Sequence, residues 1–361
     1  NNKGEIIEID SLAEILTIVR NSNPDIKINL SLAGGALLPG EAKIWKAFVD
    51  IPSKRPVLIK SIIAFVEKYV FDGVVMDLEW RNVTKGYSPF ILELNEVLEP
   101  KNIDLTAALP GIYRYSNITD EAIHTFDFIN LMAYDETGSW APNRPGQHSS
   151  LAFAQRSIEF WRDGVGIPPE KLTLGLPLYA YNFTNPKRTK SHTIAEMLAL
   201  NYENAFKDSV GLIFYNGKPT LEAKVKLAAT DLAGVMVWEL GQDTTGDFAM
   251  INTIHNQFKK LKMRTSDDFC GLTEQEIFEI QNAEFKKKVN ITPIKKNFAI
   301  VYEDLKNLKV IVTDSKNKIS KLKVFEEKGR NIYKIKKLKK GIYTISISDN
   351  EFNFEKKLQL K

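Results

Sequence analysis

Short apolar runs alternate with amphipathic stretches through the first 261 residues of the chain. The apolar runs have the length of strands, and near-continuous apolar character, as in Gly73-Val-Val-Met76, is typical of strands covered on both faces. The stretches between them, such as 57–70 and 152–163, place apolar residues at helical spacing. This order predicts a parallel α/β fold. Its strands are expected at 26–33, 71–79, 103–110, 126–134, 171–180 and 234–240.

Polar and aromatic residues gather where these predicted strands end, which is where a (β/α)8 TIM barrel keeps its active site. A closed barrel of this type needs eight strands, whereas the pattern contains six and opens with a helix-like segment at 9–20. We therefore predict a TIM barrel whose first two strands are missing from this numbering. An open sheet of six strands is the alternative.

The second half of the chain departs from the strand–helix alternation. Residues 181–229 are long for a connection and include Gly211-Leu-Ile-Phe-Tyr215, which predicts a small β-containing insertion before the last strand. Residues 263–290 are polar, with a predicted helix at 274–283. Six short alternating runs between 298 and 360 predict a β-sandwich. The expected domains are a catalytic barrel at 1–262, a connector at 263–290 and an accessory β-sandwich at 291–361.

Charge and composition narrow the possible partners. The net charge of +4 divides unevenly, since residues from 262 onward carry 23 Lys and Arg against 14 Asp and Glu. These cations are almost all lysines, which favours a solvated β-domain surface over a nucleic-acid reader. No apolar run is long enough to span a membrane. The protein is expected to be a monomer. Cys270 is the single cysteine, and His124, His148, His192 and His255 show no ligand spacing, so neither a cysteine-based metal cluster nor a histidine-built zinc site is predicted.

The run that ends in Asp77-Leu78-Glu79 carries the strongest chemical signal. Residues two apart in a strand share a face, so Val75, Asp77 and Glu79 should point together into the barrel. Two carboxyl groups on an apolar strand are costly unless a site uses them. Close together they cannot both ionise freely, and the less solvated one keeps its proton to higher pH. We assign the proton-donor role to Glu79, which lies nearest the open end of the strand. An ordinary acidic strand end is the alternative.

Five segments together resemble one enzyme family. Asp72-Gly73-x-x-x-Asp77-x-Glu79 resembles the D-G-x-D-x-D-x-E signature of the family 18 glycoside hydrolases, the chitinase family. Val75 stands at the family's middle aspartate, so slowed or retuned catalysis is expected. Four further segments resemble the family's motifs in the family's order: Ser31-Leu-Ala-Gly34-Gly35, Met132-Ala-Tyr134-Asp135, the run from Lys171 to Tyr179, and Gly234-Val-Met-Val-Trp238.

The resemblance implies retaining, substrate-assisted hydrolysis of β-1,4 N-acetylglucosamine linkages, without metal or cofactor. Glu79 would protonate the glycosidic oxygen, Asp77 would hold the acetamido N–H, and Tyr134 would orient the acetamido oxygen. Substrate-binding roles are implied for Trp238, Asp135, Met132, Tyr179, Trp80 and Trp140. Structural roles are expected for Asp72, Gly73, Ser31, Gly34 and Gly35.

Several functions share these motifs. Gly138-Ser-Trp140 with Gly146-Gln-His148 resembles chitinases and favours chitin or chitooligosaccharides as substrate. An endo-β-N-acetylglucosaminidase acting on N-glycans is the first alternative, an inactive carbohydrate-binding lectin the second, and a structural or adhesion protein the third.

The end of the chain carries a resemblance of its own. Residues 340–361 resemble the C-terminal sorting domains of Bacteroidetes-type secretion, which implies a secreted or cell-surface protein. A polysaccharide-binding or plain accessory β-domain is the alternative.

Overall fold

The chain divides into two compact units, Asn1–Asp268 and Phe269–Lys361. The computed structural model describes residues 3–6, 10–34 and 37–263 of the first unit. In the second unit it describes 289–294, 297–302, 309–316, 318–319, 323–327, 330–334, 341–348 and 353–360. Gly35 and the helix predicted at 274–283 lie outside the described residues.

The first unit is built on one parallel sheet of six strands. Their order in the sheet is β1 (Asn29–Ala33), β2 (Gly73–Asp77), β3 (Asp104–Pro110), β4 (Ile129–Met132), β5 (Leu172–Pro177) and β10 (Gly234–Trp238). All six predicted strands are therefore present. In the described part of the chain β1 and β10 do not pair, so the sheet is open there. The structure therefore contains a barrel-like parallel sheet, and closure of the predicted TIM barrel is not seen in these residues.

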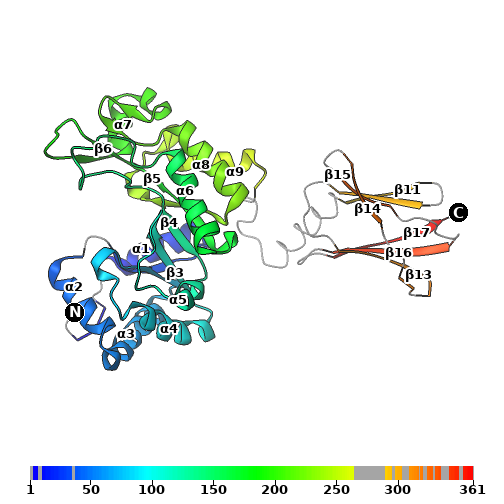
Figure 1. The fold of residues 1–361 in the computed structure, drawn as a ribbon, viewed down its shortest axis with the longest axis horizontal. Coiled ribbons are helices and arrows are strands. Elements are labelled where there is room, and N and C mark those ends of the chain that lie inside the picture. The colour runs from blue at the N-terminus through cyan, green and yellow to red at the C-terminus, as the bar shows by residue number, and fades with distance from the viewer. Residues whose placement is uncertain are drawn as a thin grey trace. The chain divides into compact units, whose positions relative to one another are not determined.

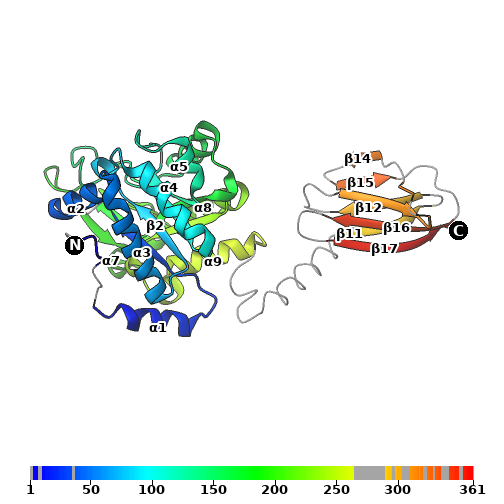
Figure 2. The same ribbon diagram turned by 90° about the horizontal axis from the view of Figure 1, so that it is seen from below.

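Helices connect successive strands and cover one face of this sheet (Figures 1 and 2). They are α2 (Pro39–Val49), α3 (Arg55–Tyr69), α4 (Tyr87–Leu98), α5 (Asp120–Thr125), α6 (Leu151–Ile158) and α8 (Lys218–Asp231), with α1 (Leu12–Ser22) before β1 and α9 (Met250–Lys260) after β10. Val74 and Met76 of β2 are fully buried against this helical layer, whereas Val75 on the other face is half-buried. The alternation leaves the second face of β2 for the carboxylates.

A small antiparallel sheet follows β5. Its strands are ordered β7 (Lys190–Thr193), β6 (Tyr179–Asn182), β9 (Ile213–Phe214) and β8 (Ser209–Val210), and α7 (Ile194–Leu200) lies between β7 and β8 in the chain. This sheet is the β-structure predicted within 181–229.

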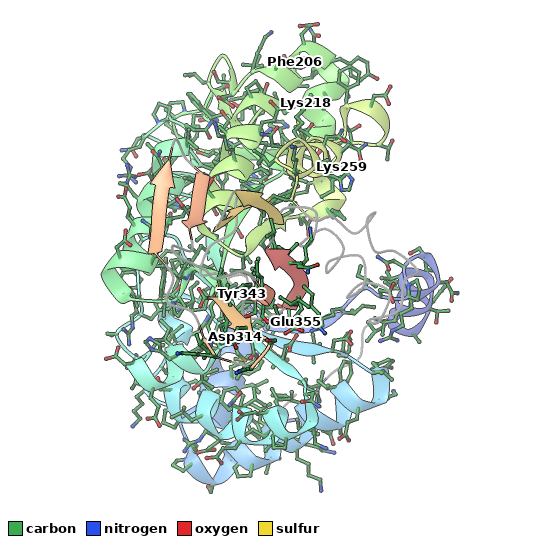
Figure 3. All side chains as sticks on the ribbon, turned by 90° about the vertical axis from the view of Figure 1, so that its right-hand side faces the viewer. Phe206, Lys218, Lys259, Asp314, Tyr343 and Glu355 are labelled. Carbon is green, nitrogen blue, oxygen red and sulfur yellow. The ribbon has the colours of Figure 1, made fainter. Side chains whose placement is uncertain are left out.

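Lys218, at the start of α8, lies over the rings of Phe206 and Phe248, with its Nζ 5.8 and 5.1 Å from the ring centroids (Figure 3).

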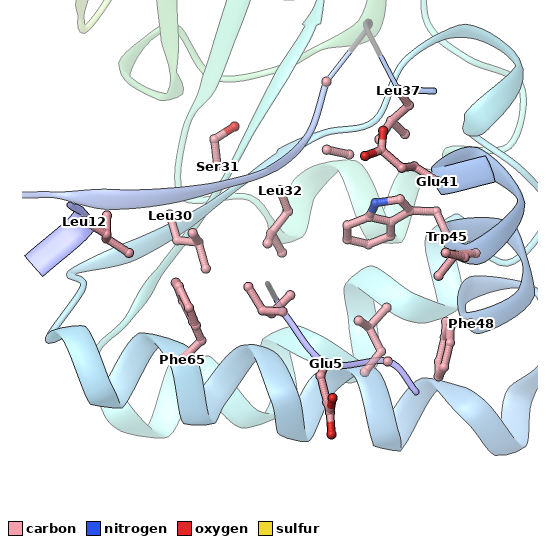
Figure 4. Close-up of a pocket in the computed structure, with 16 residues that line it drawn as sticks. Glu5, Leu12, Leu30, Ser31, Leu32, Leu37, Glu41, Trp45, Phe48 and Phe65 are labelled. Atoms are coloured by element: carbon pink, nitrogen blue, oxygen red, sulfur yellow. The ribbon is translucent and has the colours of Figure 1, made fainter. Parts of the chain in front are cut away.

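An apolar pocket of about 580 Å³ lies on the helical side of β1. Leu30 and Leu32 of β1 line it together with Trp45 of α2 and Phe65 of α3, while the Ser31 side chain points to the other side of the strand (Figure 4). The carboxylates of β2 belong to the face toward which Ser31 points, since Ser31 pairs in register with Val75.

The second unit contains two antiparallel sheets, which form separate layers (Figure 1). One has the order β11 (Val289–Ile294), β12 (Asn297–Tyr302), β15 (Arg330–Lys334) and β14 (Lys323–Glu327); the other has β13 (Lys309–Asp314), β16 (Gly341–Ser348) and β17 (Asn353–Leu360). Tyr343, Ile345 and Ile347 alternate with half-buried or exposed residues along β16, as a strand with one covered face requires. β11 begins inside the predicted connector, so the sequence pattern missed this strand.

Candidate active site

The two carboxylates of β2 lie at its carboxyl end, where the sequence predicts them. Asp77 is the last residue of the strand and is 9% exposed, while Glu79 is half-buried just beyond it. Leu78 between them is fully buried, since it belongs to the opposite face of the chain. Asp77 pairs in register with Ala33 of β1, so its backbone is fixed by the sheet.

Burial controls the protonation of Asp77. Desolvation, followed by the negative charge of Glu79, raises the pKa of Asp77 from 3.8 to about 7. Among the residues that the structure describes, Asp77 Oδ1 has no hydrogen-bond partner. The sequence pattern predicts the retained proton on Glu79, because of its position at the strand end. The structure differs, because the inner carboxyl group is the less solvated of the two.

Tyr134 and Asp135 follow β4 and complete the centre of the site. Burial raises the pKa of Tyr134 well above 10, and the charges of Asp135, Asp77 and Glu79 add to this effect. The Tyr134 hydroxyl is therefore protonated and lies close to all three carboxylates. Asp135 has a left-handed backbone (φ 60°), and its Oδ1 accepts a hydrogen bond of 2.5 Å from the Tyr179 hydroxyl.

Gly175 of β5 lies directly beneath this centre. A Cβ atom at this position would lie 2.4 Å from the Leu131 carbonyl oxygen and 2.9 Å from Tyr134 Cε1. Only glycine allows β5 to approach β4 and the Tyr134 ring this closely.

The remaining residues predicted to bind substrate lie at or after the carboxyl ends of strands. Met132 is half-buried at the end of β4, and Trp238 is the last residue of β10. Trp80 and Trp140 lie in the segments after β2 and β4, and all three tryptophans are about half or more exposed. Trp140 stacks with the Arg144 guanidinium at 4.9 Å, and Trp80 lies edge-on to Tyr115.

The residues predicted to be structural lie around β1 and β2. Asp72 precedes β2 and accepts a hydrogen bond from the Ile28 backbone N–H at 2.7 Å. A Cβ at Gly73 would lie 2.8 Å from Asn29 Oδ1. Ser31 is exposed on β1. Gly34 has φ 138°, and a Cβ added there would lie 3.6 Å from Asp77 Oδ2.

Four residues near the centre were not assigned a role from the sequence. Tyr115 lies near Glu79 and Asp77, and burial raises its pKa to about 12. Tyr87 is fully buried near Tyr115 and Asp77, which with desolvation raises its pKa. Tyr181 hydrogen-bonds Asp135, and His148 lies behind that carboxylate. Tyr87 begins α4, Tyr181 lies on the inserted sheet, and Tyr115 and His148 lie in loops. The spacing of these residues in the sequence gives no signal that they meet at one site.

One known protein family matches most of this chain. Residues 2–243 match the model of the family described as glycosyl hydrolases family 18. The chain belongs to this family. Within the described residues of this family 18 chain, no helix is long and apolar enough to cross a membrane, and no group of three or more His, Cys, Asp or Glu side chains could hold a metal ion.

Chitinases are among the proteins of similar sequence and structure, as are chitinase-like proteins such as an agglutinin from Robinia pseudoacacia. The GH18 chitinase ChiB from the chitin utilization locus of Flavobacterium johnsoniae is 42% identical with a TM-score of 0.73, covering 76% of this chain and 88% of that one. A chitinase from Bacteroides thetaiotaomicron is 29% identical with a TM-score of 0.63, covering 73% and 86%. The probable chitinase 2 of Drosophila melanogaster is 26% identical over 69% of this family 18 chain, which spans 63% of that relative's length.

Proposed function

We propose that this chain hydrolyses β-1,4 linkages between N-acetylglucosamine residues of chitin or chitooligosaccharides. The observation that carries the proposal is the buried Asp77 carboxyl group beside Glu79 and the protonated Tyr134 hydroxyl. Chitinases of similar sequence and fold support the substrate class. The proposed reaction retains the anomeric configuration, with the substrate's own acetamido group as nucleophile.

Proton transfer begins with the coupled carboxyl groups of Asp77 and Glu79. In the free protein below pH about 7, Asp77 holds a proton because it is buried. In the proposed complex the substrate's acetamido N–H donates a hydrogen bond to Asp77, which stabilises the carboxylate form of Asp77. The proton that Asp77 held in the free protein then passes to Glu79. Glu79 then protonates the glycosidic oxygen as the bond to the leaving sugar breaks.

The acetamido oxygen attacks the anomeric carbon in the same step, which gives a cyclic oxazolinium ion. The Tyr134 hydroxyl donates to this oxygen and fixes its direction of attack. The Asp77 carboxylate faces the positive charge that develops. Glu79, now ionised, removes a proton from the water that opens the ring, and this restores the acid.

The surrounding residues are proposed to hold the sugar chain. Asp135 hydrogen-bonds the distorted sugar at the cleavage point, and Trp238 offers that sugar a flat apolar face. Met132 and Tyr179 form the wall of the same pocket. Trp80 and Trp140 are proposed to stack on neighbouring sugars, which their exposed surfaces of 65% and 61% support.

We also propose that the protein acts outside the cytoplasm or on the cell surface. The support is the resemblance of its C-terminal strands to secretion sorting domains. Immunodetection in the culture medium, cell envelope and cytoplasm of the source cells tests this. Detection in the cytoplasm alone would contradict it.

Turnover of two substrates, with Glu79→Gln beside the wild type, tests the proposed function. We expect hydrolysis of a fluorogenic chitobioside but not of a high-mannose glycopeptide. Removing the acid should lower kcat by about 10²–10⁴-fold. Glu96→Gln, a change at an exposed residue of α4, should leave kcat unchanged.

Other outcomes identify the alternatives. Turnover of the glycopeptide alone would indicate an endo-β-N-acetylglucosaminidase acting on N-glycans. Oligosaccharide binding without turnover of either substrate would indicate a lectin and refute the enzymatic proposal.

A further inference from the structure

His148 is fully buried directly behind Asp135. Its ring lies between those of Tyr179 and Tyr181, with centroids 4.9 and 5.0 Å away. Nε2 lies 3.3 Å from the Tyr179 carbonyl oxygen, and Nδ1 lies 3.4 Å from Asp135 Oδ1. Nδ1 has no hydrogen-bond partner in the part of the chain that the structure describes. Both ring nitrogens thus face oxygen acceptors, and the imidazole has no contact with solvent.

Two tyrosine hydroxyl groups hold the Asp135 carboxylate from this side. The Tyr179 hydroxyl donates to Oδ1 at 2.5 Å, and the Tyr181 hydroxyl hydrogen-bonds the same carboxylate. Even so, 44% of the Asp135 side chain is exposed. A proton on His148 Nδ1 would add a donor behind the carboxylate and leave its exposed side for a sugar.

A second buried group, Lys224 of α8, fixes the segment that carries His148. Its Nζ lies 2.7 Å from the Ser149 carbonyl oxygen, 2.6 Å from Ser149 Oγ and 2.7 Å from Asn216 Oδ1. Three acceptors match the three hydrogens of an ammonium group. Burial lowers the pKa of Lys224 to about 7, and the neutral amine would satisfy only two of them.

This cluster joins the His148 segment to the end of β4. Ser149 Oγ donates to the Ala133 carbonyl oxygen at 2.6 Å, and the Glu136 backbone N–H donates to the His148 carbonyl oxygen at 3.0 Å. Tyr134 and Asp135 lie between these two attachment points. Displacement of the His148 segment would therefore move both residues.

We propose that His148 is a positioning residue that supports Asp135 from behind, in a place set by the Lys224–Ser149 contacts. The proposal rests on the proposed function of Asp135 in sugar binding. His148 itself touches no substrate, because its side chain is 0% exposed. Its effect on the reaction passes through the orientation of the Asp135 carboxylate.

Hydrolysis of chitooligosaccharides by His148→Leu and His148→Asn tests this role. Leucine removes the donor, so we expect kcat to fall about 10- to 100-fold, since small displacements at a site have effects of this order. KM should change less than kcat. The asparagine Nδ2 can take the place of Nδ1 and donate to Asp135, so His148→Asn should recover most of the lost kcat. His124→Leu, at an exposed histidine of α5, is the matched control.

A double-mutant cycle separates positioning from general destabilisation. In an Asp135→Asn background, His148→Leu should lower kcat little further, because the two residues act through one contact. Equal losses for His148→Leu and His148→Asn, or additive losses with Asp135→Asn, would overturn the proposal.

Nitrogen NMR of the four histidines distinguishes this proposal from the proposed function. The His148 ring signals, assigned by their loss in His148→Asn, should shift in Asp135→Asn and Lys224→Met but not in Lys226→Met, a change at an exposed lysine of the same helix. If these shifts occur but the protein hydrolyses no substrate, the proposed enzymatic function is refuted, while the proposal that His148 supports Asp135 is retained. If the protein hydrolyses substrate but the shifts do not occur, only the proposal about His148 is refuted.

Discussion

Asp77 is the last residue of β2, and its neighbours on the same face of the chain are Val75 and Glu79. Val75 offers no hydrogen to the carboxyl group, and in the described part of the chain Oδ1 is unsatisfied. The pKa of about 7 follows from this poor solvation more than from the repulsion by Glu79. Family 18 signatures have an aspartate where this chain has Val75, so the protonation of Asp77 is the property that this valine is expected to retune.

The raised pKa of Asp77 predicts a pH-dependent stability effect. Between pH 3.8 and about 7 the folded state binds more protons than the unfolded state, so stability falls as the pH rises through this window. Asp77→Asn removes the cost of the buried charge. We expect it to raise the free energy of unfolding by about 2–4 kcal/mol at pH 8 and to have no such benefit at pH 4.

Thermal unfolding at the two pH values measures this difference. Asp10→Asn, at an exposed aspartate, should leave Tm unchanged at both. An equal change in Tm at pH 4 and pH 8 for Asp77→Asn would contradict the assignment of the buried proton.

At the scale of the elements, close approach of β5 to β4 positions Tyr134. Gly175→Ala would place a methyl group 2.4 Å from the Leu131 carbonyl oxygen, so the strands must separate. We expect a loss of about 1–3 kcal/mol in the free energy of unfolding, as overpacked cores show, and a lower kcat because Tyr134 moves.

The control for this change is Gly234→Ala in the neighbouring strand β10, where a Cβ meets no atom within 4 Å. It should leave both stability and kcat close to those of the wild type. Wild-type kcat in Gly175→Ala would show that the position of Tyr134 does not depend on this contact.

The strands of the first unit could be predicted because each is a separate apolar run. Their ends were placed too far out, as at 71–79 for Gly73–Asp77, since residues beyond the ladder continue the pattern. Closure of the sheet depends on pairing between distant segments and has no local signal. The period-two spacing predicted Asp77 and Glu79 together, but which of them is more buried depends on the surrounding loops. His148 could not be assigned a role, because it meets Tyr179 31 positions away.

At the scale of the whole molecule, the two units differ in charge and in their match to the family. The family match covers residues 2–243 and ends within the first unit. The sequence before residue 262 carries 26 Lys and Arg against 31 Asp and Glu, while the remainder is basic. The residues of the proposed chemistry all lie in the first unit, within the family match.

The central claim is that the substrate's acetamido group is the nucleophile. The most direct measurement compares kcat of the full chain on a chitooligosaccharide with kcat on the same compound carrying N-trifluoroacetyl groups. Fluorine withdraws electrons from the attacking carbonyl oxygen, so a reaction through the oxazolinium ion predicts a steep fall in kcat with fluorination. Equal kcat values on the two compounds would contradict the account.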